Sequence, residues 1–78
     1  MAPKTAREII DAFGGTRALG DLLGRPRNVV SQWLRIGIPP KYWPELSRRA
    51  AEGIATESIT IEVLERHVPS EARTPEAV

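Results

Sequence analysis

Glycines at four points along this chain divide it into short segments, and this division limits the fold more than any other feature of the sequence. They are Gly14-Gly15, Gly24, Gly37 and Gly53, and each follows a short run whose apolar residues recur at helical spacing. Glycine ends helices readily because it adopts the left-handed conformation at low cost. The chain has 78 residues and no cysteine, so we expect one domain without disulfides or cysteine-bound zinc. The pattern predicts an all-α fold, a compact bundle of four to five short helices.

Capping residues mark the starts of the first two predicted helices. Thr5 and Glu8 form a T-x-x-E capping box, in which each side chain bonds a free backbone N–H group. Thr16 is expected to cap a second helix, which ends at Gly24. The side chains that this arrangement turns inward are Ile9, Ile10, Phe13, Leu19, Leu22 and Leu23.

Prolines set the limits of the next two helices. Pro26 suits the first turn of the third helix, where its missing N–H group costs nothing, and Gly37 ends that helix. The two prolines in the segment PPKYW, residues 39–43, prevent continuation, so we expect a tight turn there and a fourth helix starting at Pro44. The predicted core residues of these two helices are Val30, Trp33, Leu34, Leu46, Ala50 and Ile54.

The C-terminal part of the chain leaves one element ambiguous. Alternating apolar residues at 59–63 are typical of a strand, whereas Thr60 suits the cap of a short helix within residues 58–67, and the helix is preferred. Residues 69–78 contain two prolines and almost no bulky apolar side chain, which predicts a flexible tail. We therefore expect a helical domain over residues 1–68 followed by that tail.

The charged residues are distributed unevenly along the chain. Residues 16–49 carry seven basic side chains and two acidic ones, whereas residues 50–78 carry two basic and six acidic ones. A basic centre with an acidic end indicates one face for a polyanion and another turned away from it.

A polar stripe runs along the third predicted helix opposite its core residues. Its five members share one helical face because they are spaced i, i+1, i+4, i+5 and i+8. Arginine can bind guanine through two hydrogen bonds, and asparagine or glutamine can bind adenine in the same way. No acid lies on this face, which suits a surface next to phosphates. The predicted base-contacting residues are Arg27, Asn28, Ser31, Gln32 and Arg35.

Candidates for phosphate contact flank this stripe. Thr16 and Arg17 begin the second helix, where free N–H groups and a cation favour an anion. Arg48 and Arg49 are left out of the site, because cations at the end of the fourth helix complement its dipole. The complete set of predicted phosphate contacts is Thr16, Arg17, Arg25, Pro26, Lys41 and Tyr42.

The twenty residues from Thr16 to Arg35 resemble the helix-turn-helix motif of phage Cro and repressor-type proteins. Gly20 stands where that motif needs a very small residue, and Gly24 stands at its turn. The family's buried positions are matched by Leu19, Leu23, Val30 and Trp33.

The following stretch, VVSQWLRIGIPPKYWPEL, is similar to Cro-like and YdaS-like prophage regulators, so the resemblance covers about residues 5–67. The sequence departs from the pattern at Arg25, where the family has an apolar residue, and at Pro26, where a capping serine or threonine is common. The resemblance implies a lambda-repressor-like fold that places the third helix in the major groove of duplex DNA. It also implies a bacterial or prophage transcription regulator, in the simplest case a repressor.

The expected partner is an inverted-repeat operator bound by a homodimer, because a single recognition helix reads too few base pairs for a regulator. The pairing surface is expected within Ile54 to Val68, beyond the basic centre. The alternative function is a protein-interaction module on the same scaffold, such as a YdaS-like antitoxin.

Several other functions find little support in the sequence. His67 is the only histidine, and the glycines of this chain stop helices rather than form a phosphate-binding loop. We therefore expect neither enzymatic activity nor a cofactor, a metal or a small-molecule ligand. No segment has the length and apolar character of a signal peptide or a membrane span, so a cytoplasmic location at the nucleoid is expected.

Overall fold

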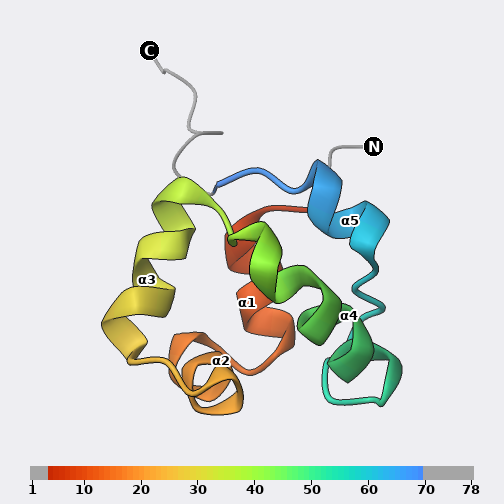
Figure 1. Cartoon of the computed structure of the whole chain (residues 1–78), viewed down its shortest axis with the longest axis horizontal. Coiled ribbons are helices and arrows are strands. Elements are labelled where there is room, and N and C mark those ends of the chain that lie inside the picture. The colour runs from red at the N-terminus through yellow and green to blue at the C-terminus, as the bar shows by residue number, and fades with distance from the viewer. Residues whose placement is uncertain (1–3, 70–78) are drawn as a thin grey trace.

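The computed structural model describes residues 4–69, which form five α-helices around one core (Figure 1). Within these residues there is no strand, only an isolated parallel bridge between Thr5 and Val68. The predicted all-α class is thereby confirmed. The helices are α1 (Ala6–Ala12), α2 (Thr16–Leu23), α3 (Arg27–Ile36), α4 (Trp43–Ala51) and α5 (Ile61–Arg66), with a 3-10 helix, η1 (Pro40–Tyr42), before α4.

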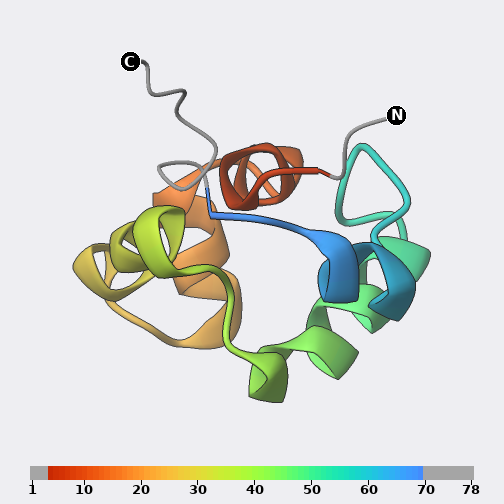
Figure 2. The same cartoon turned by 90° about the horizontal axis from the view of Figure 1, so that it is seen from above.

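The core lies between α1 and the helices around it (Figures 1 and 2). Each helix contributes at least one side chain that is almost fully removed from water, as the helical spacing of the apolar residues predicts. Trp33 belongs to the buried core, since only 3% of its surface is exposed. The largest fully buried side chains are Ile9, Ile10, Leu19, Leu46, Ile59, Leu64 and Val30.

Two predicted caps are confirmed by hydrogen bonds. The Thr5 hydroxyl accepts from the Glu8 N–H at 3.1 Å, and the Thr5 N–H donates to the Glu8 carboxylate at 2.9 Å. The Thr60 hydroxyl accepts from the Val63 N–H at 3.2 Å and caps α5. The ambiguous segment is therefore a helix. In a strand packed on a sheet, Ile59 and Ile61 would share one buried face, whereas here Ile59 is buried and Ile61 is partly exposed.

The starts of three helices differ from the sequence prediction by one residue. Gly15, not Thr16, is the N-cap of α2, because its left-handed φ of 101° turns the chain and its carbonyl accepts from the Leu19 N–H at 2.9 Å. Pro26 is the N-cap of α3 rather than part of its first turn. Helix α4 starts at Trp43, since Pro44 fits the second position of a helix as well as the first.

The predicted inward position of Ile54 is wrong. Helix α4 ends at Ala51, and Ile54 lies in the following loop with 48% of its surface exposed. The expected tight turn at 39–43 is present in part as η1.

Long-range hydrogen bonds hold the segment after α5 against residues 4–6 and against the backbone that follows α3. This segment crosses from α5 to the end of α3 (Figures 1 and 2). Val68 pairs with the start of the chain through bonds of 2.8 and 3.1 Å to Ala6 and Lys4. His67 Nε2 accepts from the Ile38 N–H at 2.9 Å, and its Nδ1 contacts the Leu64 carbonyl oxygen. The single histidine therefore fixes the backbone just after α3.

Of the predicted tail at 69–78, only Pro69 lies within the described residues, where it is half-buried. The prediction for residues 70–78 falls outside them. Among residues 4–69, no helix combines the length and the apolar character that crossing a membrane requires.

Candidate nucleic-acid interface

A three-residue turn, Gly24 to Pro26, sets α3 tightly against α2. Gly24 adopts the left-handed conformation, and the Arg25 N–H donates to the Gly20 carbonyl at 2.8 Å. A Cβ atom at position 20 would lie 2.6 Å from the Arg25 carbonyl oxygen and 3.4 Å from Val30 Cγ2. The predicted need for a very small residue at Gly20 is confirmed, because the turn occupies the space that a side chain would need.

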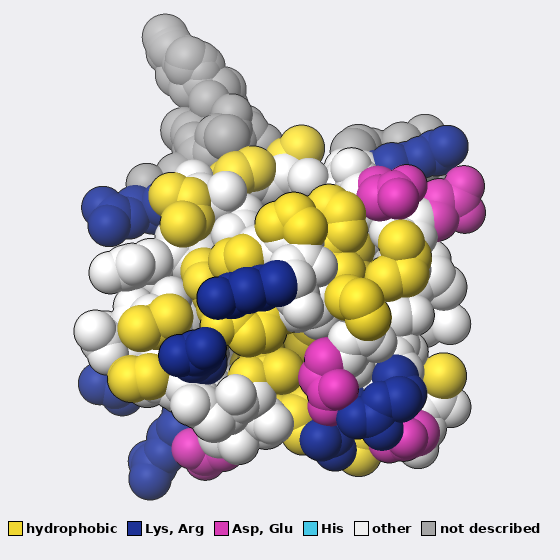
Figure 3. Space-filling view, viewed as in Figure 1, with side chains coloured by type: hydrophobic (Ala, Val, Ile, Leu, Met, Phe, Trp, Pro, Cys, Tyr) yellow, Lys and Arg dark blue, Asp and Glu magenta, His cyan; other side chains and the backbone are white. Residues whose placement is uncertain are grey.

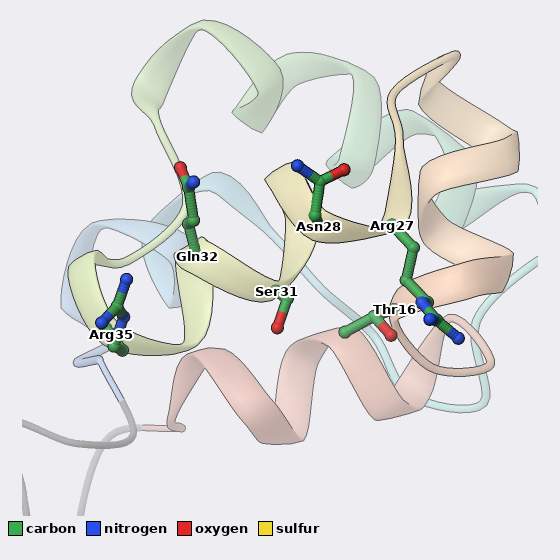
Figure 4. A pocket seen from close by; sticks show the side chains of 6 residues that line it. All are labelled: Thr16, Arg27, Asn28, Ser31, Gln32 and Arg35. Atoms are coloured by element: carbon green, nitrogen blue, oxygen red, sulfur yellow. The ribbon is translucent and has the colours of Figure 1, made fainter.

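Helix α3 divides into a core face and a polar face. Val30 and Trp33 are buried, whereas all five members of the predicted stripe are exposed. These five side chains and Thr16 together line one open groove (Figure 4). Ser31 points to the side where Thr16 lies, while Asn28 and Gln32 point to the opposite edge. The structure thus brings all the predicted base-contacting residues together on a single surface.

Several basic side chains outside this surface are engaged by carboxylates. On α4, Arg48 lies 2.7 Å from Glu45 and 2.9 Å from Glu52, and Arg49 lies 2.5 Å from Glu45. Hydrogen bonds from Arg48 and Arg49 lower the pKa of the Glu45 carboxyl below its usual value. These ion pairs are a second reason, besides the helix dipole, for leaving Arg48 and Arg49 out of the site. The other pairs are Lys4–Glu57, Arg7–Asp11 and Arg66–Glu62.

The remaining cations of residues 4–69 are those assigned to DNA contact. None of them has a carboxylate oxygen within 4 Å of its charged nitrogens, so their charge is not neutralised by an ion pair. They are Arg17, Arg25, Arg27, Arg35 and Lys41. The acidic side chains in Figure 3, by contrast, gather mainly on the side of α4 and α5.

A second hollow joins the groove at its α2 end. It is lined by Arg17, Arg25, Pro26 and Arg27, together with Asp21. Arg27 lines both depressions, so the predicted phosphate contacts of α2 and the turn adjoin the predicted base contacts of α3. Asp21 is the residue that the sequence interpretation overlooked, and it places one negative charge among these arginines.

Lys41 and Tyr42 lie in η1, outside the residues that line the groove. The Tyr42 ring is half-buried and packs against the Trp33 ring, with 4.9 Å between the ring centroids. The predicted phosphate contact through Tyr42 therefore competes with a packing role that the sequence did not reveal. Trp43 donates its indole N–H to the Ile38 carbonyl at 2.9 Å, so it covers the edge of the core.

Exposed apolar side chains are few in the described chain. Within the predicted pairing surface, Ile59 and Leu64 are buried, while Ile54 is 48% and Ile61 is 37% exposed. Ile36, at the end of α3, is 68% exposed and was not predicted to have any role.

No three side chains of His, Cys, Asp or Glu within residues 4–69 are arranged to hold a metal ion. Comparisons with protein-family models, with curated proteins and with solved structures found no match.

Proposed function

We propose that this protein binds duplex DNA sequence-specifically and regulates transcription, in the simplest case as a bacterial or prophage repressor that occupies a promoter. In this proposal α2, the turn and α3 are a helix-turn-helix, and α3 enters the major groove. The arrangement of α3 supports it, since one face is buried and the other carries hydrogen-bonding side chains with no acid among them.

The observation that carries the proposal is the division of the cations into two sets. Within residues 4–69, carboxylates lie within 4 Å of the basic groups of α1, α4 and α5, whereas five basic groups around α3 have no carboxylate that close. Leaving several like charges on one side of a small domain costs repulsion unless a polyanion binds there. DNA supplies that polyanion, and binding releases its counterions.

The side chains in the groove suit base reading. Arg27 and Arg35 can each bind guanine O6 and N7, while Asn28 and Gln32 can bind adenine N6 and N7. Thr16 and Arg17, at the start of α2, are placed to hold phosphates beside the groove.

Specific recognition further calls for two copies of α3. Each good base contact discriminates by only about 1–3 kcal/mol, so one helix falls short of what a regulator needs. We expect a homodimer on an inverted repeat with half-site centres about 10–11 base pairs apart. Ile54 and Ile61 are the exposed apolar side chains of residues 54–68 that can form the contact.

Fluorescence anisotropy with duplex DNA over a series of salt concentrations tests the proposal. Arg17→Ala should weaken binding to all duplexes and reduce the salt slope by about one unit, because it removes one phosphate contact. Arg27→Ala or Gln32→Ala should cost about 1–3 kcal/mol on the preferred site, selected from a random pool, and much less on random DNA.

Arg48→Ala is the matched control, since it removes the same charge from a residue already paired with Glu45 and Glu52. It should leave both affinity and salt slope unchanged. Absence of salt-dependent DNA binding by the unmodified protein would refute the proposal and favour the protein-interaction module. One subunit on one asymmetric site at saturation would refute the dimer alone.

A further inference from the structure

Tyr42 connects three segments that are separate in sequence. Its ring packs on Trp33 of α3 at 4.9 Å, and Trp33 is itself buried in the core. The Arg25 guanidinium, from the turn before α3, lies 5.8 Å from the centre of the same ring. The Lys41 ammonium of η1 lies 5.3 Å from it. One aromatic ring therefore has two cations beside it and the core behind it.

Within the described part of the chain, the Tyr42 ring is the partner recorded for the charged group of each cation. Neither Arg25 nor Lys41 forms an ion pair with any residue of 4–69, and both are exposed to solvent. Two positive charges beside one ring repel each other, and the negative face of the ring offsets part of that repulsion. Trp33 packs against the ring, and a ring fixed in this way that restricts two long side chains lowers the entropy cost of binding a ligand.

The position of this cluster relates it to the groove. Arg25 also lines the hollow that adjoins the groove at Arg27, and Tyr42 packs on the helix that carries the polar stripe. Figure 3 shows basic side chains lying across apolar surface on the face of the molecule that is turned toward the viewer. The two cations can be no further apart than the sum of their distances to the ring centre. With one phosphate per roughly 3.4 Å of rise along each strand, this upper limit keeps both cations within the length of a few consecutive phosphates.

We propose that Tyr42 is a positioning residue: its ring holds Arg25 and Lys41 together as a two-cation clamp on the DNA backbone beside α3. This inference rests on the proposed function, because the clamp needs a polyphosphate strand as its ligand. It changes the role assigned to Tyr42, which acts through its ring on two cations and not through its hydroxyl on a phosphate.

Salt-dependent DNA binding of variants at these three positions tests the clamp. Arg25→Ala and Lys41→Ala should each reduce the salt slope by about one unit on preferred and random duplexes alike. Tyr42→Phe keeps the ring and should bind as the unmodified protein does. Tyr42→Leu removes the ring and should weaken binding, yet cause no further loss when Arg25 and Lys41 are already alanine.

A purely structural role for Tyr42 gives a different result. In that case Tyr42→Leu would weaken binding equally with and without the two cations, and the clamp would be refuted. Because leucine also disturbs the contact with Trp33, ring-fluorinated phenylalanine at position 42 provides a second test that keeps the ring. Fluorination withdraws charge from the ring face and should weaken DNA binding only while Arg25 and Lys41 are present. Unchanged affinity on fluorination would overturn the inference.

The outcomes separate the two proposals. If Arg17→Ala and Arg27→Ala behave as expected but changes at position 42 are not coupled to Arg25 and Lys41, the clamp fails and the DNA-binding function stands. If the unmodified protein shows no salt-dependent affinity for duplex DNA, both fail together.

Discussion

Replacing Gly20 with alanine sets helix propensity against tertiary packing. In the interior of a helix, alanine is normally more stable than glycine by roughly 0.5–1 kcal/mol. At Gly20, however, the new Cβ would lie 2.6 Å from the Arg25 carbonyl oxygen. That oxygen is a backbone atom, and the N–H of the same residue donates to the Gly20 carbonyl at 2.8 Å. The turn cannot move aside without stretching this bond.

The expected cost follows from these contacts. Overpacking in a close-packed interior costs about 1–3 kcal/mol, and a weakened hydrogen bond adds about 1 kcal/mol. After subtracting the gain in propensity, Gly20→Ala should destabilise the domain by about 1–3 kcal/mol. For a chain of this size, each kcal/mol lowers Tm by about 4–8 °C.

Thermal and urea unfolding followed by circular dichroism measures this effect. Ala18→Gly is the matched control, because Ala18 is exposed on the same helix and the change reports propensity with the opposite sign. Propensity alone predicts that Ala18→Gly destabilises and Gly20→Ala stabilises. The structure predicts that both destabilise. A Gly20→Ala protein as stable as the unmodified one would refute the argument that the turn excludes a side chain at this position.

Three further changes test other contacts. Trp33→Ala should lower the free energy of unfolding by roughly 3–5 kcal/mol, because it removes a buried side chain that also supports Tyr42. Circular dichroism should then show a largely unfolded domain at 37 °C, and a well-folded variant would contradict the buried position of Trp33. Asp21→Asn should strengthen binding to preferred and random duplexes alike in the anisotropy assay, because it removes the negative charge from the arginine-lined hollow. Unchanged affinity would mean that this hollow lies away from the DNA. His67→Phe should destabilise the domain by about 1–3 kcal/mol in urea unfolding, since it leaves the buried Ile38 N–H without its acceptor. No loss of stability would mean that this hydrogen bond is dispensable.

Local sequence determined most of the secondary structure. The capping box of Thr5 and Glu8 and the cap at Thr60 were recognisable because both partners lie within three residues of each other. The polar stripe was also predictable, since a helical period alone decides which residues share a face. The one-residue errors at Thr16 and Pro44 arose where neighbouring residues are nearly equal as helix starts.

Tertiary structure alone decided what lies beside Arg25, whereas the carboxylate partners of Arg48 and Arg49 on α4 follow from helical spacing. Arg48 pairs with Glu45 three residues before it on the same helix, whereas Arg25 lies beside the ring of Tyr42, which is distant in sequence. The bond between His67 and Ile38 likewise joins residues 29 positions apart. Helical spacing predicts contacts three or four residues away, whereas these contacts depend on how the helices pack.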